Sequence, residues 1–514
     1  MNPVQLSIFS SKVSSIAVEM GVVLQRSAFS PNIRDRLDYS CAIFNSAAEL
    51  CAQAAHIPVH LGSMAYAMKS VVDRFDWEEG DTLVLNDPFL GGTHLPDVTL
   101  VSPVFFDKSL CGFVANRAHH AHIGAESPGS MPVSSSLYEE GLVIEPQMLA
   151  REGQLVADVW QRICSELGDN DETSGDFLAQ LSANRKGVER LSKLVSDMGA
   201  EAFQQGLDKL NNYSEELARN TYTQIPDGSY KATDFMDDDG QGGKDIPLTL
   251  KLEVSGSDIR LDFSGTSDQV AGNINCPISV VAAAVYYVFR CLLPASAPAC
   301  AGMFRSIEIQ AADGSLLNAQ RPAAVSAGNV ETSSRIVDLV ITALSQAIPD
   351  KMPADSQGTM NNLAMGHAGD SENPRWNYYE TIAGGMGAAD GKRGLSAVQS
   401  HMTNTFNTPV EVLETSFPLR ISAYAIRKGS GGDGRYQGGN GLVREYQFLK
   451  PARASLLTER RRYQPKGVFG GMPALEGKNL LNDEVIVSKC EISVEAGDRL
   501  RIETPGGGGY GVAE

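Results

Sequence analysis

The stretch NDPFLGGTHLPDVTL, residues 86–100, joins a glycine turn to a run of apolar residues, a pattern typical of a loop that leads into a buried strand. A second strand-like run, CGFVANRA at residues 111–118, ends in the histidines of HHAH at residues 119–122. The chain has only 8 histidines, and four of them lie at these two strand ends. Loops at strand ends often carry functional side chains, so these stretches are the first candidates for a site.

Helical periodicity flanks this strand-rich region. Asn2 and Pro3 are typical of a helix start, and apolar residues follow at helical spacing, at Val13, Ile16, Ala17, Met20 and Leu24. A second helix is predicted from apolar positions at Leu61, Met64, Ala65, Met68, Val71 and Val72. Between them lies the irregular segment SPNIRDRLDYSCAIFN, which carries Asp38. Helical patterning returns over residues 173–222.

The second half of the chain mixes both periodicities. Alternating apolar residues at 248–254 and 259–263 flank the turn SGSD, which predicts a hairpin. Helices are expected near 279–292 and 333–347, and the last hundred residues are β-rich. We therefore expect an α+β or mixed α/β fold in three regions: residues 1–225 with the candidate site and a long helical segment, a central region 226–430, and a β-rich region 431–514 with a glycine-rich tail.

Composition and charge exclude several classes of function. The 514 residues are 42% hydrophobic, and 43 basic against 62 acidic residues give a net charge of −19. The densest basic stretch is the short TERRRYQPK at 458–466, so nucleic acid is not an expected partner. The 8 cysteines lack CxxC spacing, which favours neither a zinc ribbon nor a disulfide framework. No basic leader and no apolar run of about 18 residues is found, so we expect a cytoplasmic protein with no membrane partner.

Familiar sequence motifs give little guidance to the function. GSGGDG at 429–434 matches a dinucleotide-binding pattern, but RYQGGNGL follows it and does not start a helix. Neither a P-loop nor a GxSxG nucleophile motif occurs. The segment PGGGGYG at 505–511 is open to two interpretations, a loop around a ligand or neighbouring subunit and a flexible tail.

A divalent metal is one of two hypotheses for the strand-end residues. His94 and Asp97 lie on one loop, His119 ends the next strand, and Asp38 adds a second carboxylate. Imidazoles and carboxylates that converge from separate segments are typical ligands of such ions. The glycines at 91–92 suit a loop that needs a positive φ or a close backbone approach. The alternative is that His94 and Asp97 only pair or cap a turn, with the other histidines partly solvated.

Six blocks in their order along the chain resemble the hydantoinase B/oxoprolinase family: LNDPFLGGTHLPDVTLVSPVF, NRAHHAHIG, DFSGTSDQVAGNINCP, NYYETIAGGMGA, HMTNTFNTPVEVLE and TPGGGGYG. The resemblance covers residues 4–512. The family includes B subunits of ATP-dependent N-methylhydantoinases, 5-oxoprolinases, caprolactamase, and alpha subunits of acetone and acetophenone carboxylases.

The resemblance implies a division of labour. A separate A-type ATPase subunit uses ATP to phosphorylate a lactam oxygen, and the B-type subunit opens the ring at a metal, zinc or alternatively manganese. It implies an enzyme, a hydrolase of cyclic amides in a heteromeric complex. Its metal ligands fall on Asp38, His94, Asp97 and His119, although the HHAH run leaves His120 as an alternative to His119.

The same resemblance supplies further candidates. His120 and His122 are expected to transfer protons or to orient ligands. Glu380, Asn404 and Arg427 are weaker catalytic candidates, with a structural role as the alternative for each. Two rival functions stay open, a subunit of an ATP-dependent, biotin-independent ketone carboxylase and a non-catalytic scaffold for the ATPase. The sequence does not name the ring that is opened.

Overall fold

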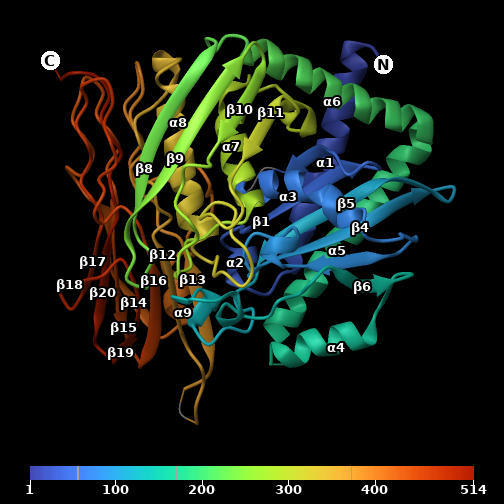
Figure 1. Ribbon diagram of the computed structural model, residues 1–514. Coiled ribbons are helices and arrows are strands. Elements are labelled where there is room, and N and C mark those ends of the chain that lie inside the picture. Colours follow the sequence, from blue (N-terminus) through green and yellow to red (C-terminus); the bar gives the residue numbers. More distant parts are fainter. Residues whose placement is uncertain (55–56, 169–170, 372, 514) are drawn as a thin grey trace.

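The computed structural model describes residues 1–54, 57–168, 171–371 and 373–513, which form four sheets and several groups of helices. Figure 1 places the N-terminal sheet (blue) on one side of the molecule and the C-terminal strands (red) on the other. The helices α7 (Ile278–Leu292) and α8 (Ser333–Leu344) lie between them. The expected mixed fold, helical in its N-terminal part and β-rich in its C-terminal part, is confirmed.

The N-terminal sheet has seven antiparallel strands in the order β2-β1-β5-β4-β3-β6-β7. Its strands are β1 (Tyr39–Asn45), β2 (Leu50–Ala54), β3 (Thr82–Leu85), β4 (Asp97–Phe106), β5 (Ser109–His119), β6 (Gln147–Arg151) and β7 (Gln154–Leu155). Asp107 and Lys108 join β4 to β5 with φ of 47° and 66°, the two-residue turn that matches strand twist. This turn and a register shift between Val104 and Phe105 together set the pairing, so Asp97 at the start of β4 lies directly opposite His119 at the end of β5.

Helices cover both faces of this sheet. They are α1 (Pro3–Ser27), α2 (Pro31–Arg34), α3 (Pro58–Val72), α4 (Ala157–Glu166), α5 (Asp171–Met198) and α6 (Ala200–Tyr222). α1 and α5 share one core with β1 and β5, whereas α3 packs in a second core on other residues of the same strands. The predicted capping of α1 is confirmed, since Asn2 and Gln5 form a reciprocal capping box.

Among the described residues, α1 alone has the length and hydropathy of a membrane-crossing helix. Its buried face holds Phe9, Val13, Ile16, Ala17, Met20, Gly21 and Leu24, which include all five predicted positions. These residues pack against α5 and the sheet, so one face of α1 belongs to the core.

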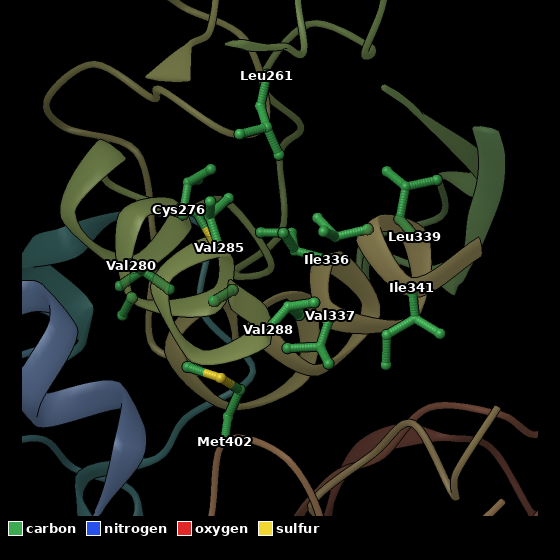
Figure 2. Close-up of a cluster of buried hydrophobic side chains, with 14 of the residues drawn as sticks. Leu261, Cys276, Val280, Val285, Val288, Ile336, Val337, Leu339, Ile341 and Met402 are labelled. Atoms are coloured by element: carbon green, nitrogen blue, oxygen red, sulfur yellow. The ribbon is translucent and has the colours of Figure 1, made fainter. Parts of the chain in front are cut away.

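The central region is a four-stranded sheet in the order β11-β10-β9-β8 packed on α7 and α8. Its strands are β8 (Gly228–Asp238), β9 (Lys244–Ser255), β10 (Asp258–Asp262) and β11 (Ile307–Gln310). The predicted hairpin is β9–β10, and its inward residues Leu248, Leu250 and Leu252 are fully buried. Figure 2 shows the core between α7 and α8, with Met402 entering from a separate segment of the chain.

Two further sheets, in the orders β13-β12-β16-β19 and β14-β15-β20-β17-β18, form the C-terminal part around a shared core. Their strands are β12 (Asn362–His367), β13 (Trp376–Glu380), β14 (Leu419–Ile426), β15 (Leu442–Phe448), β16 (Ala452–Leu457), β17 (Lys478–Leu481), β18 (Glu484–Ile486), β19 (Lys489–Val494) and β20 (Arg499–Glu503). One short helix, α9 (Val410–Ser416), precedes β14.

The glycine-rich end of the chain is buried, so the interpretation as a flexible tail is wrong. Gly507 donates to the Gly439 carbonyl at 2.9 Å and accepts from the Gly432 amide at 2.9 Å. A Cβ atom at Gly507 would lie 2.2 Å from backbone atoms of Met386. These segments touch through their backbones, and only glycine leaves room for that contact. The GSGGDG motif belongs to the same packing and starts no helix.

Part of the basic stretch at 458–466 is also buried. The guanidinium of Arg460 is fully buried, and its Nη2 lies 3.3 Å from Asp234, 2.6 Å from Asp338 and 3.2 Å from Asp355. Asp234 belongs to β8 and Asp338 to α8. Arg460 therefore joins the C-terminal part to the central region by charge-assisted hydrogen bonds.

We expect Gly507→Ala to lower the free energy of unfolding by about 3 kcal/mol or more, because rigid backbone surrounds the added methyl group. Gly265→Ala is the matched control, since Gly265 is exposed and its nearest neighbour is a Thr249 methyl group at 3.2 Å. Denaturant unfolding of both variants measures the difference. Equal stability of the two would contradict the packing described for Gly507.

Candidate metal centre

Three strands of the N-terminal sheet bring the predicted ligands to one point. Asp97 and His119 are direct partners across the β4–β5 ladder, and facing residues of an antiparallel pair project to the same side. The backbone amide of His119 donates to the Asp38 carbonyl at 3.0 Å, which sets Asp38 beside them at the entrance to β1. All three side chains are buried.

The loop before β4 adds His94. Gly91 has a φ of 114°, and a Cβ atom at Gly92 would lie 2.3 Å from the Asn86 carbonyl oxygen. The Asn86 side chain in turn donates to the Leu95 carbonyl at 2.8 Å. The loop is therefore tight, and the Asn86 side chain holds it by a hydrogen bond across its interior. The positive φ and the close backbone approach expected of its glycines are confirmed.

The ligand atoms of His94, Asp97 and His119 all lie within 4.8 Å of one another. His94 Nε2 is 3.2 Å and His119 Nδ1 is 3.4 Å from Asp97 Oδ1. The four residues predicted as ligands line one cavity, which has a volume of about 20 Å³. A volume of this size holds about one water molecule.

Hydrogen bonding leaves two lone-pair atoms facing each other in this cluster. His94 Nδ1 lies 3.2 Å from the Ser326 carbonyl, which only accepts, so Nδ1 carries the hydrogen. In the neutral ring His94 Nε2 then holds a lone pair, and it faces Asp97 Oδ1. Neither atom has a hydrogen-bond partner among the described residues. Two acceptors at this separation repel each other unless a positive charge lies near both.

The protonation states suit metal binding. Burial raises the pKa of a carboxyl group, but the His60 and His94 imidazoles outweigh it and hold the pKa of Asp97 well below its ordinary value. Burial lowers the pKa of His119. Burial alone would also lower the pKa of His94, but Asp97 outweighs it and the pKa is raised. The cluster therefore keeps Asp97 charged and attracts a positive charge toward His94, either a proton or a cation.

The second oxygen of Asp97 has three partners of its own, none of which the sequence analysis singled out. Asp97 Oδ2 accepts from Thr93 Oγ1 at 2.7 Å and from Asn329 Nδ2 at 3.2 Å, and His60 Nε2 lies 3.2 Å away. These contacts turn Oδ1 toward the two imidazoles. His60 lies in the first turn of α3, which begins at Pro58, three residues before the first predicted apolar position.

A buried carboxyl group, that of Glu140, holds the backbone segment that contacts His94. Glu140 accepts from the backbone amides of Val325 and Ser326 at 2.8 and 2.9 Å and so fixes the carbonyl that binds His94 Nδ1. Burial raises the pKa of Glu140 to about 7. Such outer contacts commonly fix the tautomer and the orientation of a ligating imidazole.

The C-terminal part closes the cavity. The Tyr379 ring of β13 stacks on the His119 ring, with centroids 4.7 Å apart. Arg36 donates to the Tyr379 carbonyl at 2.8 Å, and its Nη2 lies 3.8 Å from Asp38 Oδ2. Met360 and Met402 complete the apolar wall. The cavity is thus lined by residues more than 250 positions apart in the chain.

The two other candidate histidines lie outside this cavity. One step along the chain from His119 turns His120 to the opposite side, where Nε2 lies 2.9 Å from Gln180 Oε1 and the ring packs on Phe177 of α5. His122 Nε2 lies 2.5 Å from Arg375 Nη2. Burial and this guanidinium lower the pKa of His122 to about 4. Of the HHAH run, the structure brings His119 to the ligand cluster.

The three weaker candidates also lie elsewhere. Glu380 and Arg444 form a fully buried bidentate ion pair at 2.8 and 3.2 Å between two C-terminal sheets. Arg427 donates to the Glu476 carbonyl at 2.7 Å beside the glycine-rich segments. The Asn404 side chain is exposed, although its neighbours Thr403 and Thr405 line the cavity. The contacts of Glu380 and Arg427 are those of structural residues.

We expect Glu380→Gln to lower the free energy of unfolding by about 3 kcal/mol, because it leaves the Arg444 guanidinium buried without its counter-charge. Glu308→Gln is the control, since the Glu308 side chain is 70% exposed and lies 3.8 Å from Arg260. That variant should change stability by less than about 0.5 kcal/mol. Chemical denaturation measures both, and a Glu380→Gln variant as stable as the control would refute the structural role.

The sequence of this chain matches a known protein family and several of its members. The family model described as hydantoinase B/oxoprolinase matches residues 2–513. The 5-oxoprolinase of Dictyostelium discoideum is 38% identical over 99% of this chain, which spans only 40% of that protein. The B-type subunit of a putative D-/L-hydantoinase from Pseudomonas sp. strain NS671 is 30% identical, with 99% of this chain and 90% of that protein covered.

A solved structure agrees. The ATP-dependent caprolactamase from Pseudomonas jessenii superposes with a TM-score of 0.91 at 26% identity, and the match covers 100% of this chain and 91% of that one. Fold and sequence thus agree along the whole length, and the chain belongs to the hydantoinase B/oxoprolinase family.

Proposed function

We propose that this chain is the ring-opening subunit of an ATP-dependent cyclic amide hydrolase that acts on hydantoins, 5-oxoproline or a related lactam. The observation that carries the proposal is the buried cluster in which His94 Nε2 and Asp97 Oδ1 lie 3.2 Å apart with no hydrogen-bond partner for either atom among the described residues. A buried cluster of this kind is costly unless it binds a cation. The relatives named above open cyclic amides or are subunits of such enzymes by name.

The cation we propose is one divalent metal ion, zinc or alternatively manganese. Asp38, His94, Asp97 and His119 would hold it, because two imidazoles and two carboxylates suit either metal. A bound divalent ion would supply Lewis acidity and a lowered pKa for water at this point. The polar atoms left unpartnered at His94, Asp97 and His119 fit this assignment.

The chain's own residues prepare the reaction site around these ligands. His60 Nε2 lies 3.2 Å from Asp97 Oδ2 and 4.0 Å from Asp38 Oδ1, so the imidazole faces both carboxylates. The stacked Tyr379 ring and the methionine side chains exclude bulk water from the cavity. Fixed dipoles and charges act more strongly in such a closed site than in water.

Activation of the ring must come from elsewhere. Amide resonance makes the lactam carbonyl a weak electrophile, whereas phosphorylation of its oxygen gives an imidate-like ring with a C=N bond. The sequence contains no P-loop for ATP, and the caprolactamase relative is named ATP-dependent. We therefore assign ATP to an A-type ATPase partner that hands the phosphorylated ring to this chain.

The two rival functions make different predictions. A ketone carboxylase subunit would use the same ligands, but its product is a carboxylated ketone instead of a ring-opened acid. A scaffold for the ATPase would need no metal and would keep the complex active without the histidines. Product analysis separates the first rival from the hydrolase, and metal analysis separates the second.

We expect His94→Ala to remove the metal ion and to abolish ring opening, because it deletes one of only two imidazole ligands. Elemental analysis of the purified chain should fall from about one ion per chain to less than about 0.1. His367→Ala is the control, because its side chain lies in another part of the fold, 3.6 Å from Asp370. A His94→Ala chain with full metal content and activity would show that the site is placed wrongly.

We also expect the zinc-loaded chain alone to leave an unactivated lactam intact. A five-membered lactam gains little from ring strain, and the reaction needs the phosphoryl group of ATP. Chromatographic assay of ring-opened product, with and without ATP and the ATPase partner, measures this. Turnover by the isolated chain without ATP would overturn the division of labour and favour a self-sufficient metallohydrolase.

A further inference from the structure

A short π-helix carries one polar side chain into the metal cavity. Residues Gly328–Thr332 form this element directly before α8, and the Ser333 amide donates to the Gly328 carbonyl. A Cβ atom at Gly328 would lie 1.9 Å from the Asn275 carbonyl oxygen, so only glycine allows the chain to enter the turn here. π-Helices are rare and frequently mark functional sites, because the extra residue redirects a side chain.

The side chain that this turn directs into the cavity is Asn329. Its carboxamide is 2% exposed, and Nδ2 lies 3.2 Å from Asp97 Oδ2. A carboxylate only accepts hydrogen bonds, so the NH₂ group must face Asp97 and the orientation of the amide is determined. Asn329 Oδ1 is then buried without a donor among the described residues, and Asn329 lines the cavity.

An unpaired buried carbonyl is unfavourable, so a donor is expected in the cavity. The cavity of about 20 Å³ has room for one water molecule next to the ligand cluster. We propose that Asn329 is a further catalytic residue, whose Oδ1 accepts a hydrogen bond from the water that attacks the ring. The assignment rests on the proposed function, because it requires a ring-opening reaction at this site.

The proposed step conserves every atom. The water oxygen bonds to the ring carbon of the activated amide, the π pair of the C=N bond moves to nitrogen, and one water hydrogen ends on that nitrogen. The second hydrogen stays on the water oxygen and in contact with Asn329 Oδ1. Asn329 neither gains nor loses a proton, so its contribution is to aim a lone pair of the oxygen at the ring carbon.

Thr93 provides a matched comparison. Thr93 Oγ1 donates to the same Asp97 oxygen at 2.7 Å but does not line the cavity. Thr93→Val and Asn329→Leu therefore each remove one donor to Asp97 Oδ2 with little change in volume. Only Asn329→Leu also removes an acceptor that faces the cavity.

The experiment uses the full chain with its ATPase partner. Zinc affinity is measured by competition with a chelator, and we expect both variants to bind zinc about 10-fold more weakly, since each loosens a ligand. At saturating zinc, Thr93→Val should lose less kcat than Asn329→Leu, because it removes only the donor to Asp97 Oδ2. Asn329→Leu should stay about 100-fold lower in kcat with an unchanged KM.

The outcomes are distinct. Wild-type kcat for Asn329→Leu at saturating zinc would overturn the assignment, and so would an equal kcat loss in Thr93→Val, which would mean that Asn329 acts only through Asp97. Thermal unfolding checks that each variant folds, and Asn329→Ala replaces the leucine variant with the same expectation if that variant does not fold. A wild-type chain that binds no zinc or opens no ring would instead overturn the proposed function itself.

Discussion

The register of the β4–β5 hairpin is the constraint on which the site depends. A two-residue turn and a register shift between Val104 and Phe105 pair Asp97 with His119, and a slip of β5 by one residue would point the His119 side chain to the opposite face. The same slip would bring His120, now packed on Phe177, to the position of His119. Because the paired residues are buried, the strands also fix the separation of the carboxylate and the imidazole. The ligand cluster is thus a property of the sheet, to which the loop before β4 adds only His94.

The C-terminal half completes the site from a distance in sequence. Tyr379 and Met402 close the cavity, and their positions depend on sheets that are joined to the central region by Arg460 and its three carboxylate partners. Backbone contact between glycine segments holds these sheets where no side chain fits. Water is thus excluded from Asp97 and His119 by residues that are distant from them in the chain. The cavity therefore depends on residues from both halves of the chain.

Whether a feature of the fold or the site could be predicted from the sequence depends on how far apart in the chain its interacting residues lie. Strand alternation and glycine chemistry are local signals, so the hairpin, the capping of α1 and the tight loop around Gly92 were read correctly from sequence. The four proposed ligands were found by residue type, strand ends and family resemblance. His60 and Asn329 were missed because their contacts with Asp97 span 37 and 232 positions along the chain. Helix and strand periodicity indicates only which nearby residues share a face, so it does not predict such distant contacts. The buried glycine tail was missed for a related reason, since backbone packing leaves no pattern beyond the glycines themselves.

The small volume of the cavity suits the proposed two-subunit chemistry. A phosphorylated ring is destroyed by bulk water, so a site that uses it must admit water singly and at a fixed position. A cavity of about 20 Å³ meets the first condition, and a buried acceptor such as Asn329 Oδ1 meets the second. Tyr379 and the methionine side chains then exclude competing water, while the His60 and His94 imidazoles keep Asp97 charged. Within the proposed function, exclusion and orientation of water are therefore the main tasks of this chain, and ATP chemistry is left to the partner.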